Sequence, residues 1–172
     1  MPNWCENELT ISGRSGVLAC LVAIKEEPDE GNDGQPRYID FQRIVPMPGG
    51  LAPDAEEMDE QSILAETGCR DWDEWRDGTP ENAYNDGHWG TCQNACYFGP
   101  PINATDRRAD LAFETAWSPP SPVIIALSKQ FPTLNFTLRY WECGCGFSGI
   151  LRVRNGCILR NDRFDYGGSR GG

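Results

Sequence analysis

The chain has 172 residues, 39% of them apolar, and a formal net charge of −11. A chain of this length buries roughly two thirds of its unfolded surface, so it needs no metal or disulfide to fold. It lacks the ~20 consecutive apolar residues of a membrane span and the basic and apolar regions of a signal peptide. We therefore expect a cytoplasmic protein, without membrane association, whose eight cysteines are reduced.

The N-terminal part predicts a strand, a helix and an extended segment. Residues 3–12 alternate apolar and polar side chains, which indicates a half-buried strand. Apolar residues recur at helical spacing over 17–27, which predicts an amphipathic helix. Residues 41–48 predict a short strand or extended segment that proline ends.

The middle of the chain has no sustained strand pattern, and residues 50–88 are predicted to be an acidic insertion. Short helices at 62–67 and 71–76 are expected within it, since a long structureless loop is unusual in a compact domain. Residues 89–98 are a candidate strand.

The C-terminal part predicts four more strands and a helix. The predicted strands are 110–117, 136–140, 150–154 and 157–160, the last two joined by a turn at Asn155 and Gly156. Ser118 is the expected N-cap of a helix that Pro132 ends, with Val123, Ile124, Leu127 and Phe131 on one face.

Helices between antiparallel strands predict an α+β protein: a ferredoxin-like antiparallel sheet with two helices packed on one face. The domain is expected to span residues 1–166, with the insertion at 50–88 and a flexible glycine-rich tail at 167–172. The predicted core consists of Leu9, Ile11, Leu21, Phe113, Trp117, Val123, Leu127, Phe136 and Leu138.

Four segments carry a family resemblance: MPNWCEN at the N-terminus, TAWSPP at 115–120, Phe131-Pro132, and YWECGCGFSG at 140–149. In these segments the chain resembles the YubB-type ferredoxin-like family of plasmid and phage proteins. It departs from that family at Cys92 and Gln93, where similar proteins have a lysine and an aromatic residue. The resemblance implies the fold and a mobile-element setting, but it supplies no reaction and no catalytic residues.

Tryptophans in these segments suggest a recognition groove, because tryptophan is enriched at interfaces; packing in the core is the alternative. The candidate binding residues are Trp4, Trp89, Thr91, Trp117, Tyr140, Glu142 and Phe147.

The cysteines offer a weaker hypothesis. Four thiolates from Cys92, Cys96, Cys143 and Cys145 could hold zinc, but their spacings differ from zinc-knuckle spacing, so we expect no metal and no cofactor. The chain's one histidine, His88, lies four residues before Cys92, and no third group that would orient a catalytic pair is evident.

Charge suggests two kinds of partner. Residues Leu51 to Asp86 contain twelve acids and two bases and so carry −10 of the net charge, which would attract a basic protein surface. The alternative is nucleic acid, bound by the aromatic residues Phe136, Tyr140 and Phe147 of a sheet face. Arginines near the C-terminus would assist it: Arg139, Arg152, Arg154, Arg160, Arg163 and Arg170.

We therefore expect a non-enzymatic binding module of a plasmid or phage accessory protein, for establishment or counter-defence, that acts by protein–protein contact. The second hypothesis is a nucleic-acid-binding domain, and the third is a metal- or thiol-dependent enzyme.

Overall fold

The computed structural model describes residues 3–26, 36–47, 80–96 and 99–168. The described strands are β1 (Trp4–Ser12), β2 (Arg108–Ala116), β3 (Asn135–Glu142), β4 (Phe147–Arg154) and β5 (Cys157–Asp165). The described helices are α1 (Val17–Ile24), α2 (Phe41–Ile44), α5 (Pro80–His88) and α6 (Ser121–Gln130). No helix in these ranges is long and apolar enough to cross a membrane.

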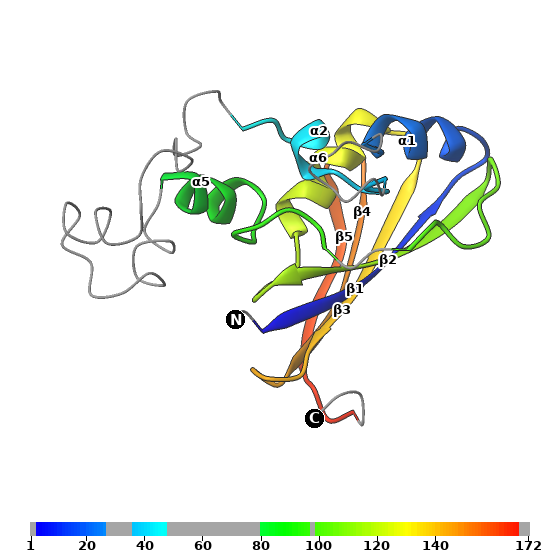
Figure 1. The fold of residues 1–172 in the computed structure, drawn as a ribbon. Coiled ribbons are helices and arrows are strands. Elements are labelled where there is room, and N and C mark those ends of the chain that lie inside the picture. Colours follow the sequence, from blue (N-terminus) through cyan, green and yellow to red (C-terminus); the bar gives the residue numbers. More distant parts are fainter. Residues whose placement is uncertain (1–2, 27–35, 48–79, 97–98, 169–172) are drawn as a thin grey trace.

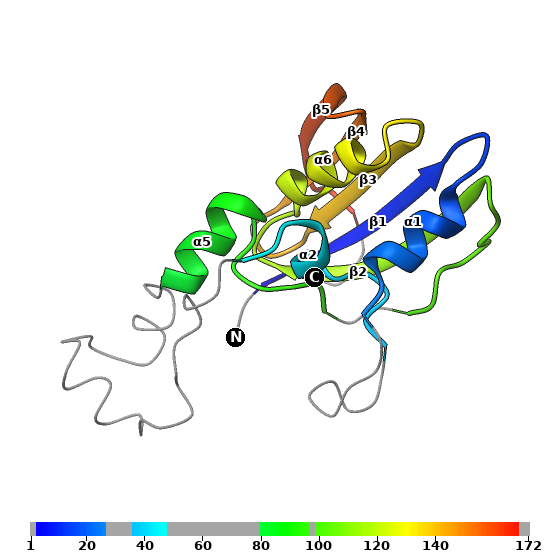
Figure 2. The same cartoon turned by 90° about the horizontal axis from the view of Figure 1, so that it is seen from above.

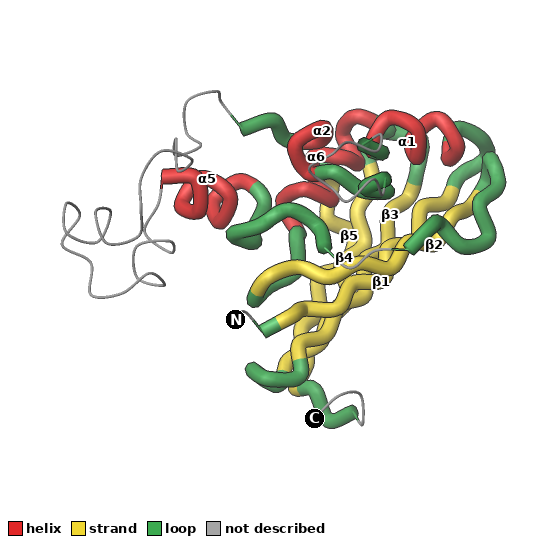
Figure 3. The backbone as a smooth tube through the Cα atoms, in the orientation of Figure 1, coloured by secondary structure: helices red, strands yellow, loops and turns green. Residues whose placement is uncertain are grey.

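The five strands form one sheet in the order β2-β1-β3-β4-β5, and every neighbouring pair is antiparallel. Helices α1, α2 and α6 lie over one face of this sheet, whereas α5 lies beyond the strand ends, on the side where β1 begins and β2 ends (Figures 1 and 2). The opposite face carries no helix in the described part of the chain (Figure 3). The predicted antiparallel sheet with helices is confirmed.

The chain order gives the sheet its ferredoxin-like character. Strands β2 and β3 are joined through α6 and lie on either side of β1, which is a split β-α-β unit. On the free edge of β2, Cys96 and Ile102 form isolated bridges with Glu114 and Asp110. These short pairings occupy the place of a further edge strand, and β4 and β5 extend the sheet on its other side.

Side chains that face the helices form the core. Leu9, Leu127, Phe136 and Leu138 have no exposed surface, and Leu111 is 3% exposed, because alternate residues of each strand point to one face. Ile11, Phe113 and Val123 are also buried as predicted, and Leu21 is partly buried against them. This apolar layer holds α1 and α6 against the sheet.

Trp117 is a correction to the predicted core, since 47% of it is exposed. Its φ of 66° is the left-handed conformation, which ends the alternation of β2 and turns the side chain away from the core. Ser118 is a second correction, because α6 begins at Ser121 after Pro120, without a side-chain cap. The hydroxyl of Ser118 instead donates to the carbonyl oxygen of Gly90.

The segment 41–48 was predicted to be extended, and its first residues form helix α2 instead. The side chain of Asp40 accepts a hydrogen bond from the backbone N–H of Gln42 at 3.0 Å, which caps this short helix. The predicted strand 89–98 is limited, in its described residues, to the bridge at Cys96. The short helices expected at 62–67 and 71–76 lie outside the described residues.

Candidate functional site

Five of the seven candidate binding residues are buried. Trp89 is 4% exposed, and its indole N–H donates to the carbonyl oxygen of Val45 at 2.9 Å. Thr91 is fully buried and donates to the carbonyl oxygen of Ala116 at 2.8 Å. Tyr140 and Phe147 pack edge to face, with ring centroids 6.1 Å apart. These side chains join elements of the fold and have little surface to offer a partner.

Glu142 is also buried, at 2% exposure, and it shapes the turn between β3 and β4. Its carboxylate accepts hydrogen bonds from the backbone N–H groups of Gly144, at 2.7 Å, and Cys145. A Cβ on Gly144 would lie 2.4 Å from Nδ2 of Asn3, so a larger residue there would displace the Asn3 side chain. The carboxylate therefore holds the turn closed.

The two remaining candidates are tryptophans that retain exposed surface. Trp4 is half-buried at the start of β1, and Trp117 is exposed at the end of β2. Trp117 lines a cleft with Asp86, Cys92 and Ser118, to which α5 contributes the carboxylate. This cleft is the part of the predicted recognition groove that the described residues form.

The four candidate zinc ligands do not form a cluster of the required kind. Within the described ranges, no group of three or more histidine, cysteine and carboxylate side chains could hold a metal ion. Cys92, Cys96 and Cys143 are half-buried, and Cys145 is exposed. Burial raises the pKa of Cys96, which disfavours the thiolate that a metal would require.

The sheet face away from the helices, called the outer face here, has a different character from the core. The aromatic residues expected to bind nucleic acid, Phe136, Tyr140 and Phe147, face the helices and are buried, which corrects their placement. The outer face instead presents Arg139 and Trp141 from β3. Sequence reasoning counted Trp141 among the tryptophans of the family-like segments but left it out of the candidate binding residues, although its alternation with the buried Tyr140 was a usable signal.

Arg139 and Trp141 line a cleft of about 530 Å³ on the outer face. Ile150 from β4, Phe164 from β5 and Tyr166 complete its apolar lining. Phe164 is 52% exposed, so its ring is accessible at this cleft. An arginine, several aromatic side chains and one carboxylate, that of Glu8, thus line one concave surface.

Acidic and basic residues both occur on the outer face, and the exposed Glu8 of β1 lies directly opposite Arg139. Glu6 and Glu114 are opposite each other on β1 and β2, and burial together with the charge of Glu6 raises the pKa of Glu114. Arg152 and Arg154 lie on β4 at the other side of β1, with Arg139 between them and the acids. The predicted C-terminal arginines therefore divide, because Arg163 turns to the helix side and stacks 4.2 Å over the Phe147 ring.

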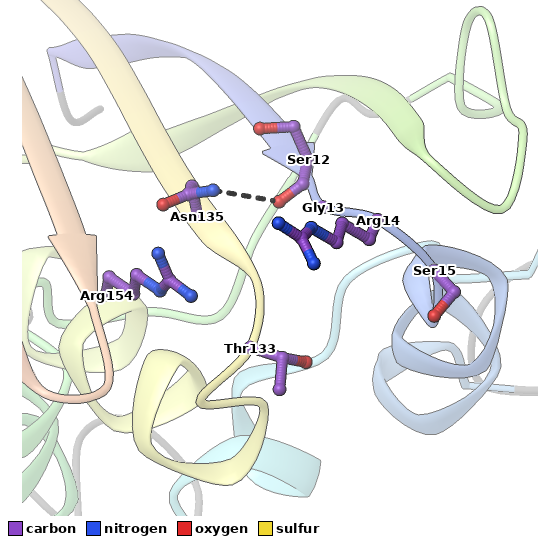
Figure 4. Close-up of a pocket in the computed structure, with 7 residues that line it drawn as sticks. All are labelled: Ser12, Gly13, Arg14, Ser15, Thr133, Asn135 and Arg154. Atoms are coloured by element: carbon purple, nitrogen blue, oxygen red, sulfur yellow. Dashed lines mark hydrogen bonds between the residues drawn. The ribbon is translucent and has the colours of Figure 1, made fainter.

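A second cleft, called the arginine cleft here, has a volume of about 800 Å³ and lies where β1 ends, β3 begins and β4 ends (Figure 4). Its lining consists of Ser12, Gly13, Arg14, Ser15, Thr133, Asn135 and Arg154. Arg14 and Arg154 extend into it from opposite sides (Figure 4). This lining contains two cations, several neutral donors and no carboxylate. Sequence reasoning named Arg154 and missed Arg14, which a turn brings to the same place.

The order of the strands and the layer of helices define the protein as a ferredoxin-like α+β domain. Comparisons with known protein families and solved structures agree with this assignment. Residues 102–170 match a family model described as "Ferredoxin-like domain in Api92-like protein". A crystal structure of protein Api92 from Yersinia pseudotuberculosis is similar with a TM-score of 0.58 and 12% identity, over 99% of this chain and 100% of that one. At this identity the likeness shows the fold alone.

No curated protein gave a significant sequence match. The ferredoxin-like part of the expected resemblance is therefore confirmed. The YubB-type name and the plasmid or phage setting receive no support from these comparisons and stay hypotheses.

Proposed function

We propose that the protein is a non-enzymatic binding module that holds single-stranded nucleic acid on the outer face of its sheet. The observation that carries this proposal is the cleft that Arg139 and Trp141 line together with Phe164 and Tyr166. Aromatic side chains stack on bases of any sequence, and arginines neutralise the phosphates beside them. Nucleic-acid binding, which was the second hypothesis from the sequence, is therefore our first proposal for the function.

Charge on the outer face suggests the path of the strand. Glu6 and Glu114 would repel phosphates on the β1–β2 side. Arg139, Arg152 and Arg154 lie on β3 and β4 and form no ion pair with described residues. A bound strand would therefore follow β3 and β4, away from Glu6 and Glu114, whereas Glu8 lines the cleft beside Arg139 and would weaken the attraction there. The charge of −10 at residues 51–86 weakens this attraction at low salt and is screened beyond roughly 10 Å at 0.1 M salt.

Binding of fluorescent single-stranded DNA and RNA, followed by anisotropy across a salt series, tests the proposal. Trp141→Ala should weaken binding by about tenfold, since a stacked base contributes ~1–3 kcal/mol. Arg139→Gln should weaken it and flatten the salt dependence. Trp117→Ala and Arg43→Gln are matched controls, because both residues are exposed away from this cleft. Absence of binding by the wild type, or equal binding by Trp141→Ala, would refute the proposal.

A protein partner with a basic surface is the second candidate function, as expected for a plasmid or phage accessory protein in establishment or counter-defence. The exposed Trp117 beside Asp86 favours it, because a tryptophan next to carboxylates suits an arginine- or lysine-rich surface. The −10 charge of residues 51–86 would strengthen the attraction. A metal- or thiol-dependent enzyme, the third hypothesis, gains no support from the described residues.

Pull-down from host lysate across a salt series, with partners identified by mass spectrometry, tests the second candidate. One variant is Trp117→Ala, with Trp141→Ala as its control. Another neutralises five acids to Gln or Asn: Glu56, Glu57, Asp59, Glu60 and Asp73. Both variants should lose the same partner, and the effect of neutralisation should shrink at high salt. A partner retained by both variants would show that neither the tryptophan nor the acidic segment recognises it.

A further inference from the structure

The arginine cleft collects positive charge without local neutralisation. The side chains of Arg14 and Arg154 make no hydrogen bond or ion pair with another described residue. Two guanidinium groups that extend into one space repel each other, and an anion between them would relieve that repulsion. This arrangement is notable in a chain whose net charge is −11.

The backbone holds Arg14 at its place through a close turn. Gly13 donates its N–H to the carbonyl oxygen of Arg107 at 3.0 Å. A Cβ on Gly13 would lie 2.5 Å from Cδ2 of Leu134, which is 1% exposed. Glycine thus allows the turn to pack directly on the buried Leu134, which precedes β3, and Arg14 follows at the cleft.

Arg154 is held by the turn that follows β4. Asn155 and Gly156 both have positive φ values, 49° and 72°, as in the tight turns that favour Asn-Gly. The N–H of Gly156 donates to Oγ of Ser128 at 2.9 Å, and Ser128 is fully buried in α6. The backbone next to Arg154 is therefore fixed against the helix layer.

The other lining residues suit a phosphate. Ser12, Ser15 and Thr133 bring hydroxyl groups, and Asn135 donates to the carbonyl oxygen of Ser12 at 3.5 Å. Arginine binds phosphate oxygens in pairs through its planar fork, and hydroxyl groups complete the shell. The nearby N-terminus of α1 is already occupied, since Gly16 donates its N–H to the Asp106 carboxylate at 2.9 Å.

We propose that the arginine cleft is a binding site for a phosphate group, gripped between Arg14 and Arg154. The phosphate belongs either to a small phosphorylated molecule or to a nucleic-acid strand. The lining of this site shares no residue with the outer-face cleft of Trp141, although Arg154 also lies on the path proposed there for a strand. Arg14 belongs to the arginine cleft alone, and pyrophosphate binding does not depend on the outer-face proposal. Its volume of about 800 Å³ leaves room for the group that carries the phosphate.

The test measures pyrophosphate binding by calorimetry and the binding of dT oligonucleotides with a 5′-phosphate or a 5′-hydroxyl by anisotropy. Arg14→Gln and Arg154→Gln should each weaken phosphate binding by about tenfold, and the double variant by more. Each substitution should also lower the slope of log K against log salt by about 0.7 for a single strand. Arg14→Lys with Arg154→Lys should restore part of the affinity, because charge is kept while the fork is lost.

Arg43→Gln is the matched control, an exposed arginine outside the cleft, and thermal melts of every variant exclude unfolding. Pyrophosphate binding that the double variant abolishes supports a site for small phosphates. If the arginine variants bind oligonucleotides more weakly and pyrophosphate binding is not affected, the phosphate belongs to a nucleic-acid strand. If only the 5′-phosphorylated oligonucleotide responds, it is the terminal phosphate of that strand. Failure of the wild type to bind any of these probes, or equal binding by the folded double variant, overturns the proposal. If Trp141→Ala loses oligonucleotide binding and the arginine variants do not, the outer-face proposal is supported and the arginine-cleft proposal is refuted.

Discussion

Trp89 and Val45, 44 positions apart, are joined by a hydrogen bond of 2.9 Å from the indole N–H to the backbone carbonyl oxygen. The same indole packs edge to face on Phe41, with centroids 5.7 Å apart. One side chain thus links the segment after α5 to helix α2.

Replacement of Trp89 should test this link. Trp89→Phe removes the donor and keeps an aromatic ring, so we expect a loss of about 1–3 kcal/mol in the free energy of unfolding. Trp89→Ala also leaves a cavity and should cost about 3–5 kcal/mol. Urea unfolding followed by circular dichroism measures both. Trp117→Phe, at an exposed tryptophan, should change stability by less than about 0.5 kcal/mol; an equal effect at both sites would contradict the assignment.

Ser128→Ala should destabilise the turn between β4 and β5. The hydroxyl of Ser128 accepts from Gly156 and donates to the carbonyl oxygen of Ile125 at 2.8 Å. Its loss leaves the Gly156 amide without this partner, at a cost of about 1–3 kcal/mol in unfolding free energy. Hydrogen exchange at Gly156 should accelerate as well. Ser148→Ala, at a half-buried serine on the outer face, is the control, and an unchanged exchange rate at Gly156 would be the contrary result.

Cysteine reactivity should follow local environment. Burial raises the pKa of Cys5 and Cys20 to about 12, so both thiols should resist iodoacetamide at pH 8 in the folded protein. Cys145 is exposed, yet its hydrogen bond with Glu142 raises its pKa, so the exposed Cys157 should react before Cys145. Peptide mass spectrometry over a time course measures the order. Glu142→Gln should accelerate Cys145, and an unchanged rate there would exclude Glu142 as the cause.

Glu114 should make stability depend on pH. Burial, and then the charge of Glu6, raises its pKa above the ordinary 4.5, so the folded state holds the proton more tightly than the unfolded state. The resulting penalty is absent below pH 4.5 and grows as pH rises through the folded-state pKa. Glu114→Gln should therefore gain stability relative to the wild type as pH rises from 4 to 7.

Urea unfolding at several pH values measures this difference. Glu6→Gln should produce part of this gain in stability, because it removes the negative charge beside Glu114 and leaves the burial of Glu114 in place. A difference between Glu114→Gln and the wild type that does not change with pH would refute the assignment.

The sequence by itself determined the secondary structure that depends on local periodicity. Alternation placed β1, β2 and β3 within a few residues of their bounds, and the helical stripe placed Leu127 at the fully buried face of α6. These patterns succeed because burial of one face repeats every two residues in a strand and about every 3.6 in a helix. The turn at Asn155 and Gly156 was also predictable, since both residues tolerate positive φ.

Tertiary structure decided which conspicuous residues are buried in the core and which line a cleft. Trp89 and Tyr140 look like recognition residues in the sequence, but long-range packing places them in the core. Arg14 and Arg154 are 140 positions apart, and no local pattern relates them. They share a cleft because β1, β3 and β4 lie side by side in the sheet, with the turns after β1 and β4 at the same end. Strand pairing between distant segments creates that neighbourhood, and local periodicity does not specify which strands pair.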